Sequence, residues 1–379
     1  MHYLAELDAA SVANALSGLA LTPGASLLVL LPVAEASAVP RLQAACSAKA
    51  LRLVGAIFPE LIVAGDLSKQ GAWLLPLPSG TPTFLVDGLG SDAVSDAARI
   101  AASVRSGLTQ FDSPIDRPLL ALVFDGLLPH IASVLDELYL VLANRVEYTG
   151  ANSGNETFAP MPCVFDNVTL VDHGVIGMLL PGRHGAALEH GFVVPPHALA
   201  ATATAGNCIA AIDWRPAFSV YQELVAGSYG VTLTPENFYQ YGVHFPLGIL
   251  LASGDVIVRV PVALREDGAL SCIGEIPENA MLVVLRASDI DDSTCVTRLA
   301  ERLAFDEGSL IGGDLLLFYC AGRRLHHMQH ACEEFSRLQR ATGAAQVGGA
   351  LSNGEIGSLR RNGYPTLQNE CLVGLPWGA

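Results

Sequence analysis

Residues 312–357 read GGDLLLFYCAGRRLHHMQHACEEFSRLQRATGAAQVGGALSNGEIG, and they contain a strand, a helix and a second strand. The apolar run at 315–319 predicts the first strand, and apolar residues at helical spacing over 325–342 predict the helix. A second apolar run at 345–351 ends in the polar turn SNGE at 352–355. Because ligands in open α/β sheets tend to bind at the carboxyl ends of strands, this turn is a candidate site. An ordinary crossover with a solvated turn is the alternative.

The same layout occurs twice earlier in the chain, at residues 26–57 and 119–151. The sequence GANSGNE from Gly150 aligns with GALSNGE from Gly349, whereas the first copy ends GAIFPE. Three copies indicate an internal repeat. Each copy is followed by a turn into a buried strand that closes on Pro or Gly. We therefore interpret the first copy as scaffold and expect any chemistry in the second and third.

These patterns predict an α/β (α+β) protein whose mixed sheets are flanked by helices and contain a repeated strand-helix-strand-hairpin unit. A length of 379 residues favours two domains, since single cores seldom grow so large. The alternating strand and turn pattern stops and restarts near residue 212. We therefore predict an N-terminal domain at 1–211 and a C-terminal domain at 212–379.

Composition and charge narrow the classes of function. The net charge of −16 argues against nucleic-acid binding, which requires basic surface. No run of eighteen apolar residues is present, so no membrane insertion is expected. The N-terminus lacks a basic leader, which predicts a cytoplasmic protein. Eight cysteines are spread singly along the chain, as is typical of reduced thiols.

Signatures of common enzymes and metal sites are missing. The chain contains no GxxxxGK[ST], GxSxG or HExxH motif, so catalysis is not expected. His326 and His330 are four residues apart and could share a metal, but a solvated helix start is the stronger interpretation, and we expect no metal site. A haem ligand could come from a second group of loop histidines, for which surface or turn positions are the alternative. That group comprises His173, His184, His190 and His197.

Two arginines are candidates for ligand or structural roles. Arg323 follows the strand at 315–319, where a guanidinium can hold a carboxylate with two hydrogen bonds. A salt bridge to Glu355 or another acid explains it equally well. Arg259 lies inside the apolar run DVIVRVPVAL and needs a partner if it is buried.

Cys320 and the polar turns supply the remaining candidates. A thiolate at Cys320 would be stabilised by the following helix N-terminus and by Arg323, although a structural cysteine is the simpler interpretation. Asn152 and Ser153 in the second copy, like Ser352 and Asn353 in the third, offer hydroxyl and amide groups suited to a small polar ligand. Turn formation alone accounts for such residues about as well.

Several segments resemble the FIST family, the paired N-terminal and C-terminal FIST domains of bacterial sensory proteins. The resemblance rests on GALSNGEIGS near the end of the chain and is supported by LLLFYCAGRR and FPLGI. VIVRVPVALREDGALSC and DWRPAFSVYQELV add to it. The matches keep their order from about residue 26 to near the end.

The resemblance implies a sensory and signal-transduction protein that binds a small ligand, for instance an amino acid or a small carboxylate, and passes a signal to a kinase or cyclase. Some similar members bind haem and respond to nitric oxide, so a haem-based sensor is the first alternative. A cysteine-dependent enzyme is the second, and a homodimer is left open. The expected ligand-binding residues are Arg323, Asn353, Glu355, Ser352, Asn152, Ser153, Cys320 and Arg259.

Overall fold

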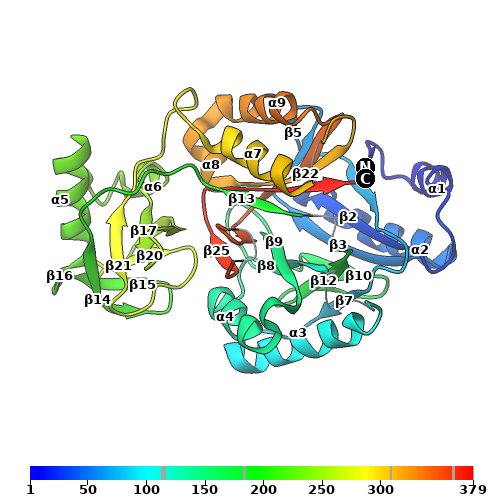
Figure 1. Cartoon of the computed structure of the whole chain (residues 1–379), viewed down its shortest axis with the longest axis horizontal. Helices are drawn as coiled ribbons and strands as arrows, with labels where there is room; N and C mark the ends of the chain where they lie inside the picture. The colour runs from blue at the N-terminus through cyan, green and yellow to red at the C-terminus, as the bar shows by residue number, and fades with distance from the viewer. Residues whose placement is uncertain (112–116, 182–184, 308–309, 361–362, 379) are drawn as a thin grey trace.

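The computed structural model describes residues 1–111, 117–181, 185–307, 310–360 and 363–378. They form three repeats of one α/β unit and a smaller unit, rich in strands, that is inserted into the third repeat. Figure 1 shows the inserted unit on the left, in green and yellow, beside the body made by the repeats. The mixed α/β class and the repeated unit expected from the sequence are confirmed.

The first repeat shows the plan of all three. A strand and a helix precede a parallel strand-helix-strand unit, which is followed by a hairpin and a closing antiparallel strand. Its elements are β1 (His2–Leu4), α1 (Ala9–Gly18), β2 (Ser26–Pro32), η1 (Val33–Ala38), α2 (Val39–Ala48), β3 (Arg52–Phe58), β4 (Leu61–Val63), β5 (Asp66–Ser68) and β6 (Ala72–Pro76).

The second and third repeats follow the same order. The second contains β7 (Thr83–Val86), α3 (Ala93–Leu108), β8 (Leu119–Asp125), α4 (Ile131–Leu142), η2 (Ala143–Arg145), β9 (Glu147–Ser153), β10 (Val164–Asp166), β11 (Leu170–Val171) and β12 (Val175–Leu180). The third contains β13 (Ala187–Glu189), α7 (Cys295–Glu307), β22 (Asp314–Cys320), α8 (Ala321–His327), η3 (Met328–His330), α9 (Ala331–Thr342), β23 (Gln346–Ser352), β24 (Glu355–Gly357), β25 (Thr366–Gln368) and β26 (Leu372–Trp377).

The inserted unit, which we call the satellite, lies between β13 and α7. It has its own core, in which Tyr221, Phe238 and Leu270 are buried. The domain boundary expected between residues 211 and 212 falls at the end of β15. The satellite contains β14 (Leu199–Ala205), β15 (Cys208–Ile212), β16 (Arg215–Pro216), α5 (Ala217–Tyr229), α6 (Phe238–Gly242), β17 (Leu247–Leu250), β18 (Val256–Arg259), β19 (Pro261–Leu264), β20 (Leu270–Cys272) and β21 (Met281–Val284).

Each repeat contributes its hairpin to the sheet of another repeat. β4 of the first repeat pairs with β23 of the third, β10 of the second pairs with β3 of the first, and β24 of the third pairs with β9 of the second. All three pairings are antiparallel, and together they form a closed cycle. Every six-stranded sheet of the body therefore contains strands from two repeats, and the segments that follow β9 and β23 are brought together.

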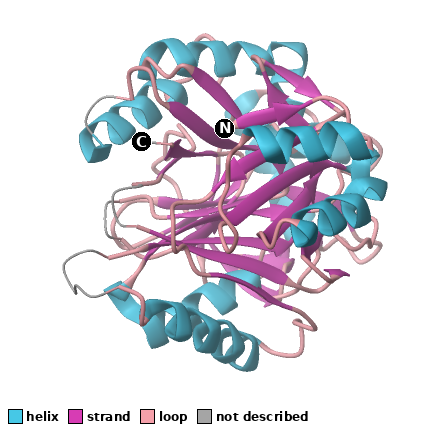
Figure 2. Cartoon of the chain, turned by 90° about the vertical axis from the view of Figure 1, so that its right-hand side faces the viewer, coloured by secondary structure: helices cyan, strands magenta, loops and turns pink. Residues whose placement is uncertain are grey.

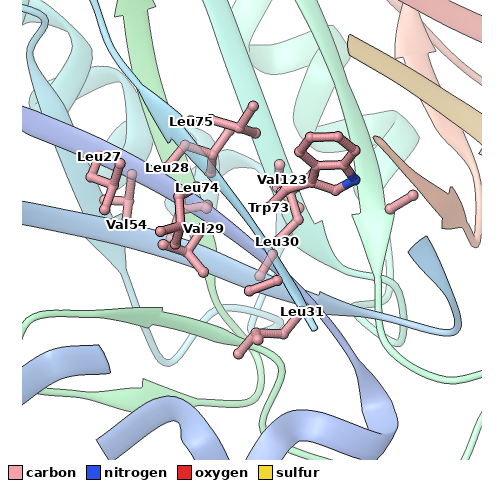
Figure 3. Close-up of a cluster of buried hydrophobic side chains, with 14 of the residues drawn as sticks. Leu27, Leu28, Val29, Leu30, Leu31, Val54, Trp73, Leu74, Leu75 and Val123 are labelled. Carbon is pink, nitrogen blue, oxygen red and sulfur yellow. The ribbon is translucent and has the colours of Figure 1, made fainter. Parts of the chain in front are cut away.

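Both faces of the central strands are buried, which explains why they read as continuous apolar runs. In β8, Ala121 and Val123 face a central core shared by the three sheets, whereas Leu122 and Phe124 face α3 and α4. Figure 3 shows Val123 in this central core beside Trp73 and the leucines of β2. Figure 2 shows helices along the outside of the sheets. The longest helix among the described residues, α3, has 16 residues, and none is long and apolar enough to cross a bilayer.

Two glycines at equivalent positions allow the strands to pack closely. Gly150 in β9 and Gly349 in β23 have φ values of 152° and 156°, which side-chain-bearing residues rarely adopt. A Cβ at either position would lie 1.8 Å from a backbone oxygen, that of Leu122 or Leu317. The glycines in the motifs GANSGNE and GALSNGE are therefore a steric requirement of the sheet.

Candidate functional site

The carboxyl ends of paired parallel strands bring one residue pair together in each repeat. Cys320 lies opposite Ser352 in the third repeat, and Asp125 lies opposite Ser153 in the second. In the first repeat, Pro32 and Phe58 occupy the equivalent positions. The chemistry-bearing side chains at these strand ends thus belong to the second and third repeats.

The polar turns of the second and third repeats are directly hydrogen-bonded to each other. The backbone N–H of Asn353 donates to the backbone carbonyl of Asn152 at 3.0 Å. The backbone N–H of Asn152 donates to the backbone carbonyl of Gly354 at 2.8 Å. The Asn353 side-chain Nδ2 donates to the Asn155 carbonyl at 3.0 Å. The exchanged strand β24 causes this contact, because it places the third-repeat turn beside β9.

Glu355 lies beneath this contact as a fully buried carboxyl group. It accepts hydrogen bonds from Ser352 Oγ at 2.6 Å and from Cys371 Sγ at 3.1 Å. Burial raises the pKa of Glu355 from 4.5 to about 8, because the charged form loses its hydration. At neutral pH the group is therefore largely protonated, and it can both donate and accept hydrogen bonds.

A cavity of about 440 Å³ opens above the ends of β22 and β23. Its floor includes Cys320, Ser352 and Asn353, three side chains that carry no formal charge in their ordinary states. Most of the walls are apolar, and Tyr239, Gln240 and His244 of the satellite also line them. Glu156 lies at the rim, where it forms an ion pair with Arg324. The apolar wall residues are Phe158, Val243, Val260, Pro261, Val262, Ile273, Leu325 and Met328. Because several of these belong to the satellite, the cavity lies between the satellite and the body.

Several acceptor atoms around the strand ends have no hydrogen-bond partner among the described residues. They are Asn152 Oδ1, Asn353 Oδ1 and Glu370 Oε1, all buried. Buried polar groups in folded proteins are usually satisfied, so unpaired acceptors point to a missing donor. Glu370 precedes β26, and burial raises its pKa well above the ordinary value.

Arg323 does not line this cavity. It forms a two-bonded ion pair with Glu334, from Nε to Oε2 at 2.7 Å and from Nη2 to Oε1 at 2.6 Å, and Nη2 also donates to Ser293. Tyr319 donates to the same carboxylate at 2.7 Å. Although burial alone would raise the pKa of Glu334, the adjacent guanidinium lowers it below its ordinary value. Both groups are therefore satisfied within the protein.

Two other expected residues also lie outside the cavity. Ser153 is fully buried, and its Oγ donates to the Phe124 carbonyl at 2.9 Å. Arg259 is 2% exposed and lines a second cavity on another side of the satellite. The structure thus brings Cys320, Ser352 and Asn353 into one cavity, with Asn152 and Glu355 adjoining it.

Sequence reasoning missed the apolar walls and the buried polar turn before β26. Glu370 and Cys371 lie within TLQNEC, which reads only as a closing turn and strand, yet both are 1% exposed or less. The available signal was a run of three acidic or amide residues, Gln368 to Glu370, shortly before a buried strand. The satellite wall carried no local signal, because its position depends on contacts between distant segments.

The histidines expected to hold haem do not form a site. The ring Nδ1 of buried His190 accepts a hydrogen bond from the Phe192 amide at 2.9 Å. His173 is about half exposed in a turn, and His197 is exposed. None of these three lines either cavity described above, and His184 lies outside the described residues. These three histidines therefore supply no haem ligand to either cavity.

Comparison with known families gives two matches that together cover most of the chain. The FIST N domain matches residues 27–215, and the FIST C domain matches residues 217–358. The second match includes most of the satellite and the cavity-lining parts of the third repeat. None of the curated proteins compared with the chain matches it.

Proposed function

The chain belongs to the FIST family, whose domains are associated with sensory signal transduction, and on that premise we propose that it senses a small molecule bound in the 440 Å³ cavity. One observation carries the proposal. The cavity has a polar floor at the strand ends of the body and an apolar wall from the satellite. Such enclosed, mostly apolar pockets with a few convergent polar groups are typical of small-ligand sites.

The lining defines the chemistry of the ligand. Apolar side chains such as Val260, Val262 and Leu325 suit an apolar body of modest size. Ser352 and Asn353 on the floor offer a hydroxyl and an amide, so the end of the ligand that reaches the floor carries a group that can form hydrogen bonds with them. Glu156 lines the cavity and pairs with Arg324, so groups of both charges lie at the rim and suit the ammonium and carboxylate of an amino acid. An amino acid with an apolar side chain meets these requirements.

The other expected residues take supporting roles in this proposal. Glu355 holds the Ser352 hydroxyl from below, and Asn152 holds the backbone of the Asn353 turn. Arg323 positions the start of α9 through its ion pair with Glu334 and does not touch the ligand. The absence of catalytic motifs is consistent with binding alone.

A signal would arise because the ligand contacts two units at once. Val260 and Val262 belong to the satellite, whereas Ser352 and Asn353 belong to the body. A ligand that contacts both units stabilises one arrangement of them over the others. The ratio of its affinities for these arrangements sets how far their populations shift. A partner such as a kinase or cyclase would read that arrangement.

Cys320 gives no support to a cysteine-dependent reaction. Its thiol lies on the cavity floor, but burial raises the pKa of Cys320 well above the ordinary value, and the nearby Glu355 carboxyl adds to this effect. The reactive form of cysteine is the thiolate, which this environment disfavours.

A thermal-shift screen with the standard L-amino acids and with acetate, succinate and citrate tests the proposal. Compounds that stabilise the protein are then titrated into Val262→Trp, which fills the cavity, and into Asn353→Ala, which removes the amide. Both variants should weaken binding by about tenfold or more. Val193→Trp serves as a matched control, because Val193 is 78% exposed. If no compound stabilises the protein, or if Val262→Trp binds normally, the proposal is wrong.

A further inference from the structure

A second cavity of about 540 Å³ lies where the satellite meets α4 and the segment between β24 and β25. β18 supplies Ile257 and Arg259, α4 supplies Asp136, and Glu275 lies on the satellite side. Apolar side chains including Leu251 and Leu359 complete the walls. None of these residues lines the first cavity, so the two spaces are separate.

Arg259 is the unusual group of this cavity. It is 2% exposed, and its nitrogens Nε and Nη1 donate to the carbonyls of Glu275, Val258 and Leu367 at 2.8–3.0 Å. Arg259 Nη2 has no hydrogen-bond partner among the described residues. It is absent from the polar atoms that are both unpartnered and shielded from solvent, so it keeps some accessible surface. No carboxylate of the described residues lies within ion-pair distance of it. The buried guanidinium therefore presents free N–H groups to the cavity.

Asp136 presents the complementary group. Its side chain is exposed at the cavity, and one carboxylate oxygen accepts a hydrogen bond from the Tyr364 hydroxyl at 2.8 Å. Its second oxygen has no partner among the described residues. Burial raises the pKa of Asp136, and the hydrogen bond from Tyr364 opposes that shift.

The other charged groups of the cavity leave an excess of negative charge. Asp255 pairs with Arg360 at 2.7 Å, and Glu275 accepts from Ser133. After the Asp255 pair is set aside, two carboxylates, Asp136 and Glu275, line the cavity with one guanidinium, and the His130 imidazole lies 3.5 Å from Glu275. A ligand with a single positive charge restores neutrality, whereas an anion would be repelled by both carboxylates.

We infer that this second cavity binds a small organic cation that carries both an ammonium group and a carbonyl oxygen, the pattern of an amino amide. The ammonium pairs with Asp136, and the carbonyl accepts hydrogen bonds from Arg259 Nη2. An apolar side chain of the ligand would contact Ile257, Leu251 and Leu359. The site is independent of the sensory cavity and stands if that proposal fails.

Isothermal titration with four matched probes tests the inference, and it uses the full chain carrying Val262→Trp, which fills the first cavity and excludes binding there. Leucinamide carries both groups, isoamylamine lacks the carbonyl, 4-methylpentanamide lacks the ammonium, and L-leucine carries a carboxylate in place of the amide. Leucinamide should bind best, and each of the other three should bind about tenfold more weakly or worse, because one charge-assisted contact is lost or one repulsion is added. If leucinamide does not bind, or binds no better than isoamylamine and 4-methylpentanamide, the inference is wrong.

Two variants locate the binding. Asp136→Asn keeps an oxygen that can accept from Tyr364 and should weaken leucinamide binding by about tenfold or more. Arg259→Lys tests the second contact, provided that its thermal unfolding remains cooperative. Val193→Trp, at a position that is 78% exposed and lines neither cavity, is the control and should leave leucinamide binding unchanged. An unchanged affinity in Asp136→Asn would overturn the inference even if Arg259→Lys does not fold.

Discussion

Ser352 Oγ donates a hydrogen bond of 2.6 Å to Glu355 Oε1, and this bond connects the floor of the first cavity to a carboxyl group with no exposed surface. Glu355 belongs to β24, a strand that pairs with the second repeat, whereas Ser352 ends β23 of the third. The hairpin exchange between repeats thus places an acid directly behind the candidate ligand contact.

The stability of the protein should depend on pH through Glu355. Its folded-state pKa of about 8 exceeds the ordinary value of 4.5, so folding favours the protonated form. This contribution is fully present below pH 4.5 and is lost as the pH rises to about 8. Urea unfolding should therefore show Glu355→Gln gaining stability relative to the wild type between these two values. If the difference in the free energy of unfolding between the wild type and Glu355→Gln stays constant across this pH range, the prediction is wrong.

Gly349→Ala should destabilise the protein strongly. A Cβ at this position would lie 1.8 Å from the Leu317 oxygen, and the φ of 156° disfavours alanine as well. We expect a loss of more than about 3 kcal/mol in the free energy of unfolding, measured with urea. Gly18→Ala is the control, since its Cβ would meet nothing within 4 Å in α1, and it should change stability by less than about 1 kcal/mol. Equal effects of the two substitutions would show that strand packing does not require this glycine.

The sequence predicts the local units well and the long-range pairing poorly. Periodicity and turn residues are local signals, so the three strand-helix-strand units and the polar turns at Asn152 and Asn353 can be recognised directly. Which sheet receives β4, β10 or β24 depends instead on contacts between repeats. The sequences of these short hairpins do not indicate which strand they pair with, because register and pairing are decided by the surrounding packing.

The candidate site likewise has a part that the sequence predicts and a part that only the structure reveals. Cys320, Ser352 and Asn353 share the end of one strand pair, and the repeated unit makes their proximity predictable. The partner of Arg323 required the structure, because Glu334 is separated from it by η3, an interruption between two helices. The apolar wall at Val260 and Val262 also required the structure, since the satellite is inserted far from the strands it faces.

The ion pair between Arg323 and Glu334 should be important for stability. Both side chains are at most 7% exposed, so Arg323→Ala leaves a buried carboxylate without its counterion. The expected loss is about 3–5 kcal/mol, and the double variant Arg323→Met/Glu334→Leu should recover part of it. Arg337→Ala, on the helix α9 that carries Glu334, is the control, since its partner Asp291 is 86% exposed and the pair is worth less than about 1 kcal/mol. Chemical unfolding of the four proteins makes the comparison, and a loss in Arg323→Ala no larger than in Arg337→Ala would refute the prediction.

Cys320 should react with iodoacetamide more slowly than Cys208 at neutral pH. Cys320 is buried with a pKa well above the ordinary value, whereas Cys208 is partly exposed on the satellite. Mass spectrometry of the labelled peptides measures both rates in one sample. Val262→Trp should slow Cys320 further, because the reagent reaches this thiol through the cavity, and it should leave Cys208 unchanged. Labelling of Cys320 as fast as Cys208 would require a stabilised thiolate on the cavity floor, and a cysteine-dependent reaction would then explain the site better than ligand binding alone.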